Sequence, residues 1–341
     1  MTITIHTGQF IKAMSTSIRA GAVPMFWGSP GIGKSALAAA FAKEYNLFLI
    51  DLRLANSDPV DLVGFPNVNK ATQRAGYLPF DTFPLENDPI PEGYDGWLLF
   101  LDELPLADRP VQKGAYKLIY DRMVGQAKLH PRLMMAAAGN LITDNAFVED
   151  MSTAMQSRLT HYEVTMDNNT WVEWAEANGI HHWITSFIKT FPQMLFTFKP
   201  DHPDRTFGSG RTWESASKHL HILGIDDDLT LAALAGTISE GIAREFIGYT
   251  KIYADLPQMV QILGQPHTTP VPQEPGTVYA LTGTLAHQAT VANIDRMIVY
   301  IRRLPKEFQV ITMREMLARN PELKSTPAVI KWRSDFASAV Y

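Results

Sequence analysis

The feature that most constrains this chain is a glycine-rich segment near the start of the sequence, GSPGIGKSA at residues 28–36. Gly28, Gly33, Lys34 and Ser35 match the pattern G-x-x-x-x-G-K-[ST], in which backbone N–H groups surround phosphate oxygens. The apolar run VPMFW precedes the motif and the alanine-rich stretch ALAAAF follows it, as the strand–loop–helix context requires. The segment therefore predicts a nucleoside triphosphate site. Its residues are Gly28, Ser29, Pro30, Gly31, Ile32, Gly33, Lys34, Ser35 and Ala36.

Two adjacent acids end a second apolar run, WLLFLDE at residues 97–103. In a loop of this kind Lys34 is expected to reach the β- and γ-phosphates, and the Ser35 hydroxyl to bind Mg²⁺. Asp102 is expected beside the same ion, so Ser35 and Asp102 are the predicted metal ligands. Glu103 is then placed to polarise a water in line with the γ-phosphate. Because a kinase has no need to activate water, this pair of acids favours hydrolysis of ATP.

A third apolar run, LMMAAAG at residues 133–139, is followed by Asn140. An amide at this position can hydrogen-bond both the attacking water and the γ-phosphate, which orients the nucleophile without taking its proton. Taken alone, Gly139-Asn140 is equally well read as a simple turn. Its place in the chain, after the glycine-rich loop and the two acids, favours the catalytic interpretation.

Short apolar runs alternate with helical segments in the first half of the chain, which is typical of buried parallel strands with crossover helices. The predicted strands are residues 23–27, 47–51, 97–102, 133–138 and 161–165. This pattern predicts an α/β fold with a doubly wound, mostly parallel sheet. After residue 166 the pattern becomes helical, beginning with a helix in DNNTWVEWAEANG, and a proline-rich link at 264–276 interrupts it.

Composition narrows the class of protein. The 341 residues are 46% hydrophobic and carry a formal net charge of -5, as in a soluble globular protein rather than one that coats nucleic acid. No apolar run approaches the roughly 20 residues that cross a bilayer, and the first residues lack the form of a signal peptide. We therefore expect a cytoplasmic protein without a membrane partner. The absence of cysteine excludes disulfides, thiolate catalysis and cysteine-bound zinc.

The glycine-rich loop, LLFLDE, AAAGN, QSRL and GSGRTW follow one another in the order found in the AAA+ ATPases, which this sequence resembles. SDPVDLVGFP at residues 57–66 further resembles a segment of their MoxR-like branch. The resemblance implies an α/β ATPase core at 1–166 with a β-hairpin inserted within 67–84, and a helical lid at 167–250. It also implies a C-terminal helical extension at 251–341 packed with the lid, and assembly into a homo-oligomeric ring, usually a hexamer.

The same resemblance assigns roles to three polar residues. Asn140 corresponds to sensor 1, Arg158 in QSRL to the arginine finger given to a neighbouring subunit, and Arg211 in GSGRTW to the sensor 2 of its own lid. Both arginine roles suit a planar guanidinium that stays charged and makes fork-shaped contacts with phosphate. Without the motif context, either arginine would be read as part of a surface ion pair. The chain departs from the family pattern at Gly210, where proline is frequent, and in the LPLAD that follows Glu103.

Two functions follow from the resemblance, each with ATP and Mg²⁺ as cofactors. The first is a MoxR-like chaperone ring that remodels a protein, with a partner that carries a von Willebrand factor A-type domain. The alternative is a nucleic-acid motor or loader of the same superfamily, which would need a basic and aromatic pore loop. The expected hairpin offers only Lys70, Arg74 and Tyr77, so the protein partner is favoured. A regulatory switch without turnover is a third interpretation, against which Glu103 argues.

Overall fold

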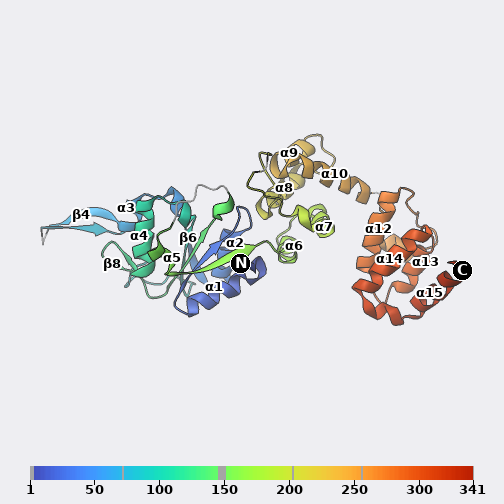
Figure 1. Ribbon diagram of the computed structural model, residues 1–341, viewed down its shortest axis with the longest axis horizontal. Helices are drawn as coiled ribbons and strands as arrows, with labels where there is room; N and C mark the ends of the chain where they lie inside the picture. The colour runs from blue at the N-terminus through green and yellow to red at the C-terminus, as the bar shows by residue number, and fades with distance from the viewer. Residues whose placement is uncertain (1–3, 71–72, 145–150, 202, 255, 341) are drawn as a thin grey trace. The chain divides into compact units, whose positions relative to one another are not determined.

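The computed structural model describes residues 4–70, 73–144, 151–201, 203–254 and 256–340. The chain divides into two compact units, Met1–Ala243 and Arg244–Tyr341. The first unit contains the main sheet with helices α1 to α9, and the second contains helices α11 to α15 (Figure 1). Helix α10 (Glu240–Ala254) includes the residue at which the two units are divided.

The main sheet has six strands, all parallel, in the order β1-β10-β2-β9-β6-β3. The strands are β1 (Thr4–His6), β2 (Val23–Trp27), β3 (Leu47–Arg53), β6 (Gly96–Asp102), β9 (Leu133–Gly139) and β10 (Leu159–Thr165). Every run predicted as a strand is a strand of this sheet. Strand β1, which pairs with β10 from Thr4↔Glu163 onward, was not predicted because three residues give too short a pattern.

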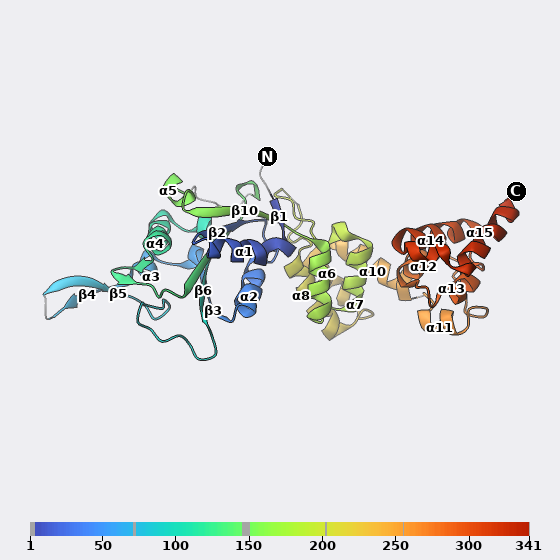
Figure 2. The same ribbon diagram turned by 90° about the horizontal axis from the view of Figure 1, so that it is seen from below.

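Both faces of the sheet are covered, which explains why the inner strand β6, between β9 and β3, is buried along its whole length. Leu98 and Phe100 pack with residues of α1 (Phe10–Arg19) and α2 (Lys34–Glu44). Leu99 and Leu101 point to the other face and pack with α4 (Arg109–Tyr120). Figure 2 shows α1 and α4 on opposite sides of the strands. The predicted doubly wound α/β class is therefore confirmed.

A separate hairpin lies outside the main sheet (Figure 1). Strands β4 (Phe65–Asn69) and β5 (Arg74–Leu78) pair antiparallel with Phe65 opposite Leu78, so the hairpin begins two residues before the predicted range. Gly64 precedes it with φ +96°, and a Cβ atom there would lie 2.5 Å from the Leu78 carbonyl oxygen. The strands close at their base because Gly64 has no side chain. The helix before it is α3 (Pro59–Val63), and the short strands β7 (Met123–Val124) and β8 (Ala127–Lys128) form a second hairpin.

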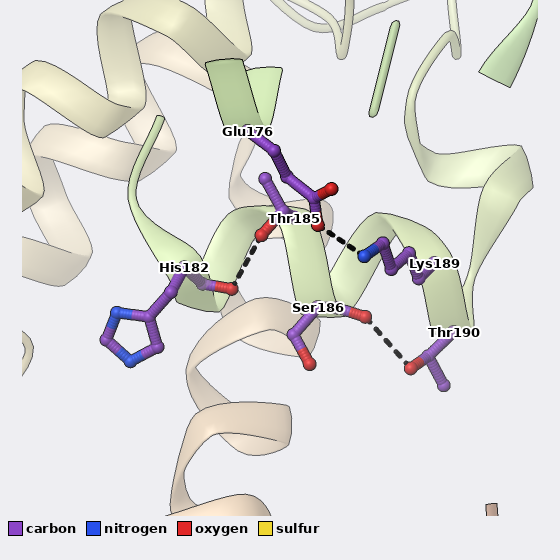
Figure 3. A network of polar contacts seen from close by, with 6 residues as sticks. All are labelled: Glu176, His182, Thr185, Ser186, Lys189 and Thr190. Carbon is purple, nitrogen blue, oxygen red and sulfur yellow. Dashed lines mark hydrogen bonds and ion pairs between the residues drawn. The ribbon is translucent and has the colours of Figure 1, made fainter. Parts of the chain in front are cut away.

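The remainder of the first unit is helical, and the sequence predicted this for the part that follows residue 166. Its helices are α5 (Thr153–Gln156), α6 (Asn168–Ala177), α7 (His182–Thr190), α8 (Gly210–Leu223) and α9 (Thr230–Ile238). Asp167 caps α6 by accepting a hydrogen bond from the Thr170 N–H at 2.6 Å. Figure 3 shows that Lys189 of α7 forms an ion pair with Glu176 of α6, while the hydroxyl of Thr185 donates to the His182 carbonyl.

The second unit is built around its own apolar core. Its helices are α11 (Met259–Gly264), α12 (Pro275–Gln288), α13 (Ile294–Ile301), α14 (Lys306–Arg319) and α15 (Pro327–Val340). The proline-rich link lies against α13 and the turn after it: the Tyr300 hydroxyl donates to the Pro270 carbonyl at 2.7 Å, and Arg303 to the Pro266 carbonyl at 2.8 Å. None of the helices in the described part of the chain combines the length and apolar character needed to cross a membrane.

Candidate functional site

Three neighbouring strands of the main sheet end at the same edge, and the predicted site residues follow them. Trp27 at the end of β2 is opposite Gly139 at the end of β9, and β9 also pairs with β6. The glycine-rich loop, Asn140 and the acids Asp102 and Glu103 therefore leave the sheet side by side. The carboxyl edge of an open parallel sheet is where α/β proteins bind their ligands.

The glycine-rich loop turns tightly between β2 and α2. The N–H of Gly28 donates to the Gly139 carbonyl at 3.2 Å, and Gly31 and Gly33 adopt φ of +84° and +94°. Only glycine adopts such angles without a steric cost, so these positions fix the path of the loop. The first turn of α2 begins at Lys34, which directs unpaired backbone N–H groups and the positive end of the helix dipole into the loop.

Lys34 lies beneath the loop with only 8% of its surface exposed. Its Nζ donates to the carbonyl of Gly28 at 2.5 Å and to Oδ1 of Asn140 at 3.1 Å. Burial lowers the pKa of the Lys34 ammonium to about 8, and the carboxylate of Asp102 opposes this shift. A shielded cation beside a ring of backbone N–H groups is suited to binding a multiply charged anion.

The predicted metal ligands are in contact with each other. Ser35 Oγ donates a hydrogen bond to Oδ2 of Asp102 at 2.7 Å, and Asp102 is buried at the end of β6. A hydroxyl and a carboxylate at this spacing fit Mg²⁺, which is held in proteins by one or two such oxygens together with substrate phosphates. Within the described residues, no three or more acids or histidines form a cluster that could hold an ion unaided. A cation at Ser35 and Asp102 would take its other ligands from phosphate and water.

Glu103 has a strained backbone. Its φ is +57°, in the left-handed region that costs a residue with a side chain about 1 kcal/mol. The Glu103 N–H donates to Oδ1 of Asp102 at 2.9 Å, which helps to hold this conformation. The turn directs the chain out of the sheet directly after Asp102, and strain of this kind is concentrated at functional sites.

Arg211 is brought to the same edge by the start of α8. Ser209 caps this helix, and a Cβ atom added to Gly31 of the glycine-rich loop would lie 2.6 Å from Ser209 Oγ. The loop and the helix start are thus in close contact. The side chain of Arg211 is exposed, and its charge contributes to lowering the pKa of Lys34.

The unusual glycine before Arg211 has a packing explanation. A Cβ atom at Gly210 would lie 2.9 Å from Nε1 of Trp171, a residue of α6 that is 7% exposed. Proline also carries a Cβ atom, so the residue that is frequent at this position in the family would collide with the indole. Gly210 therefore permits the close packing of α8 on α6.

Arg158 is not part of this cluster. It immediately precedes Leu159, which pairs with Val23 at the amino end of β2, whereas the glycine-rich loop follows the carboxyl end of that strand. At about 3.3 Å per residue, the two edges of the sheet are about 16 Å apart. Arg158 is therefore too far away to reach the loop of its own chain.

Two tyrosines of α4 hold the Arg158 side chain. Its Cζ lies 4.3 Å from the ring centre of Tyr120 and 5.3 Å from that of Tyr116. The guanidinium also donates to the Ala154 carbonyl at 3.1 Å and to Ser157 Oγ at 3.0 Å. Aromatic faces stabilise a cation without neutralising its charge.

The sequence prediction did not include Asp144. This residue ends the short 3-10 helix η4 (Ile142–Asp144) and accepts a hydrogen bond from Ser29 Oγ on Oδ1 at 3.2 Å. Burial raises the pKa of its carboxyl, and the hydrogen bond from Ser29 opposes the shift. In the sequence, the feature that could have singled it out is its position four residues after Asn140, but no motif requires an acidic residue there.

No protein-family model matches the chain, and no curated protein matches it. Among solved structures, NtrX from Brucella abortus is 15% identical, with a TM-score of 0.42 over 99% of this chain and 69% of that one. The RuvB Holliday junction branch migration motor of Thermotoga maritima is 16% identical, with a TM-score of 0.38 over 82% of this chain and 81% of that one. A putative ATPase from Cytophaga hutchinsonii is 12% identical, with a TM-score of 0.36 over 91% of this chain and 81% of that one.

Proposed function

We propose that this chain is an ATPase of the AAA+ type, which binds ATP with Mg²⁺ and hydrolyses it. The observation that carries the proposal is the meeting of Lys34, Asn140 and the hydrogen-bonded pair Ser35 and Asp102 at one edge of the sheet. The side-chain types and their order in the chain are those that phosphate binding, metal binding and activation of water require.

Each residue of the site has a separate task in this reaction. Lys34 and the N–H groups of the loop bind the β- and γ-phosphates, and Ser35 and Asp102 would hold Mg²⁺, which supplies charge neutralisation at those oxygens. Glu103 accepts the proton of the attacking water, and Asn140 orients that water against the γ-phosphate. Lys34 and Asn140 are already in contact, so binding of the γ-phosphate would rearrange both together.

The two arginines act from different subunits in this proposal. Arg211 reaches the nucleotide of its own chain because α8 begins against the glycine-rich loop. Arg158 lies at the opposite edge of the sheet, so it reaches a nucleotide only in a neighbouring subunit. This arrangement requires an oligomer in which the amino edge of one sheet faces the carboxyl edge of the next, and a closed ring such as a hexamer satisfies it.

For the work done by hydrolysis we infer remodelling of a protein, as in the MoxR-like branch, with a partner that has a von Willebrand factor A-type domain. A nucleic-acid motor is the alternative. Two arginines that follow α13 as a basic pair are engaged within the second unit, Arg302 with Asp335 and Arg303 with loop carbonyls. This use of the basic pair favours the protein partner, since phosphate binding depends on cations left accessible to the nucleic acid.

A pair of variants tests the ATPase assignment. Lys34→Ala should abolish measurable ATP binding, while Glu103→Gln should bind ATP with unchanged affinity and lose hydrolysis by at least about a hundredfold. Binding is measured by calorimetry and hydrolysis by phosphate release. Glu173→Gln, which changes an exposed acid on α6, is the matched control and should leave both unchanged.

The same Glu103→Gln protein identifies the client. Purified with ATP, it should retain the assembled oligomer and whatever macromolecule it acts on, which mass spectrometry and nuclease treatment distinguish. Hydrolysis at the unmodified rate by Glu103→Gln would remove the assigned base. Recovery of a nuclease-sensitive polymer in place of protein would replace the remodelling proposal by the nucleic-acid one.

A further inference from the structure

Asp144 lies at the phosphate-binding loop but has no task in the reaction proposed above. It is tied to the loop by the hydrogen bond from Ser29, at 3.2 Å. Its second oxygen, Oδ2, is shielded from solvent and has no hydrogen-bond partner among the residues that the structure describes. A half-buried carboxylate with one unsatisfied oxygen is costly to maintain, so its position calls for an explanation.

The charges around Lys34 indicate how Asp144 acts. Three carboxylates stabilise the Lys34 ammonium, and in order of strength they are Asp102, Asp144 and Glu103. In the proposed reaction Asp102 would bind the metal, and Glu103 would accept the proton of the attacking water, so both already have a role. Ser29 connects Asp144 to Lys34: its carbonyl accepts a hydrogen bond from Lys34 Nζ at 3.3 Å, and its hydroxyl donates to Asp144 at 3.2 Å.

We propose that Asp144 is a positioning residue that sets the affinity of the site for nucleoside triphosphate. Its carboxylate holds Ser29, and thereby the loop, and it competes with the terminal phosphates for the charge of Lys34. The proposal rests on the proposed function, because it gives Asp144 a role at the same site.

The two actions of Asp144 have opposite effects on binding. The hydrogen bond to Ser29 pre-orders the loop, which favours the phosphates. The negative charge repels them, and a repulsion that weakens affinity about tenfold corresponds to about 1.4 kcal/mol. Removal of the charge alone should therefore tighten binding, and removal of the hydrogen bond alone should weaken it.

Two substitutions separate these actions. Asp144→Asn removes the charge and keeps an oxygen that accepts a hydrogen bond from Ser29, so it should tighten ATP binding about tenfold. The gain for ADP should be smaller, because Lys34 contacts the terminal phosphates. Ser29→Ala keeps the charge and removes the hydrogen bond, so it should weaken ATP binding about threefold. Asp81→Asn, an exposed acid of the same unit, is the control and should change nothing.

The experiment measures the Kd of ATP and of ADP by calorimetry at 50 mM and 500 mM salt, with thermal melting to verify that each variant is folded. Both effects should largely persist at high salt, because salt screens half-buried charges much less than exposed ones. Equal affinity of Asp144→Asn and wild type at low salt would overturn the proposal, as would an advantage that disappears at 500 mM salt, which would mark a long-range effect of net charge. Failure of the wild-type protein to bind ATP would instead overturn the proposed function, and this inference with it.

Discussion

The two edges of one parallel sheet are built in different ways. At the carboxyl edge, loops after β2, β6 and β9 bring Lys34, Asp102 and Asn140 together in a single chain. At the amino edge, the guanidinium of Arg158 lies over the rings of Tyr116 and Tyr120. Within the described residues, no acidic side chain contacts it. The first edge brings several polar side chains into mutual contact, whereas the second holds one arginine against aromatic rings and loop oxygens.

The edges also differ in how they hold a positive charge. Lys34 is buried, and its burial lowers the pKa of the ammonium to about 8. Arg158 lies on aromatic rings, and a guanidinium stays charged in any protein environment. If Arg158 acts on a neighbouring subunit, as proposed, it must keep its charge in the free chain, and arginine suits this task better than a buried lysine does.

The largest effect expected from this comparison is that of Arg158→Ala. On the proposed function, ATP hydrolysis should fall about a thousandfold, because an arginine finger supplied by a neighbour stabilises the charge of the transition state. ATP binding should be unchanged, since Arg158 is remote from the loop of its own chain. Phosphate release and calorimetry measure the two quantities.

Mixing inactive proteins then tests the direction of the contact. Arg158→Ala mixed with Glu103→Gln should recover part of the activity, since a Glu103→Gln subunit still supplies its arginine to the intact site of its neighbour. No recovery at any ratio, with both proteins shown to assemble, would place Arg158 outside the reaction or in its own site.

Arg211→Ala should have a smaller effect, with a loss of hydrolysis of about thirtyfold, which corresponds to ~2 kcal/mol for a hydrogen bond to a charged group. Because Arg211 and Glu103 belong to the same site, mixing Arg211→Ala with Glu103→Gln should give no recovery beyond the residual activity of the first. Recovery in this mixture would mean that Arg211 acts on the neighbouring subunit, and the contrast between the two edges would be lost.

The smallest effect concerns the tyrosines under Arg158. Tyr120→Ala should reduce hydrolysis about threefold, since an exposed cation–π contact is worth roughly 0.5 to 1 kcal/mol. The control is Tyr279→Ala on α12, because Tyr279 is 59% exposed and Tyr120 is 56% exposed. If Tyr279→Ala reduced hydrolysis as well, or if Tyr120→Ala left hydrolysis unchanged, the tyrosines would not position Arg158.

Much of the core was predictable from the sequence because its signals are local. The runs that form β2, β6 and β9 are apolar and short, and each is followed by residues whose chemistry is specific, such as Lys34 or Asn140. Since parallel strands end at a common edge, the pattern alone indicated that these residues meet. The helix at α6 was predicted from its cap and its terminal glycine, and both are where the pattern required them.

The parts that were missed depend on contacts distant in sequence. Asp144 meets Ser29 across 115 positions, and no motif links them. Tyr116 and Tyr120 form a stacked pair on α4. From its sequence α4 is an ordinary amphipathic helix, and the structure shows that Arg158 lies over Tyr120. The reason for glycine at 210 was likewise hidden, because it depends on the indole of Trp171 from another helix.

Because Gly210 packs tightly on Trp171, the fluorescence of this tryptophan can report on the contact between the two residues. The indole of Trp171 is almost wholly shielded from water and lies next to the residue that precedes Arg211. Indole emission depends on the polarity of its surroundings, so any movement of α8 away from α6 would admit water to the ring and shift its fluorescence. Motions at this helix start can thus be followed in the unlabelled protein, with Trp171→Phe to identify the contribution of this one indole.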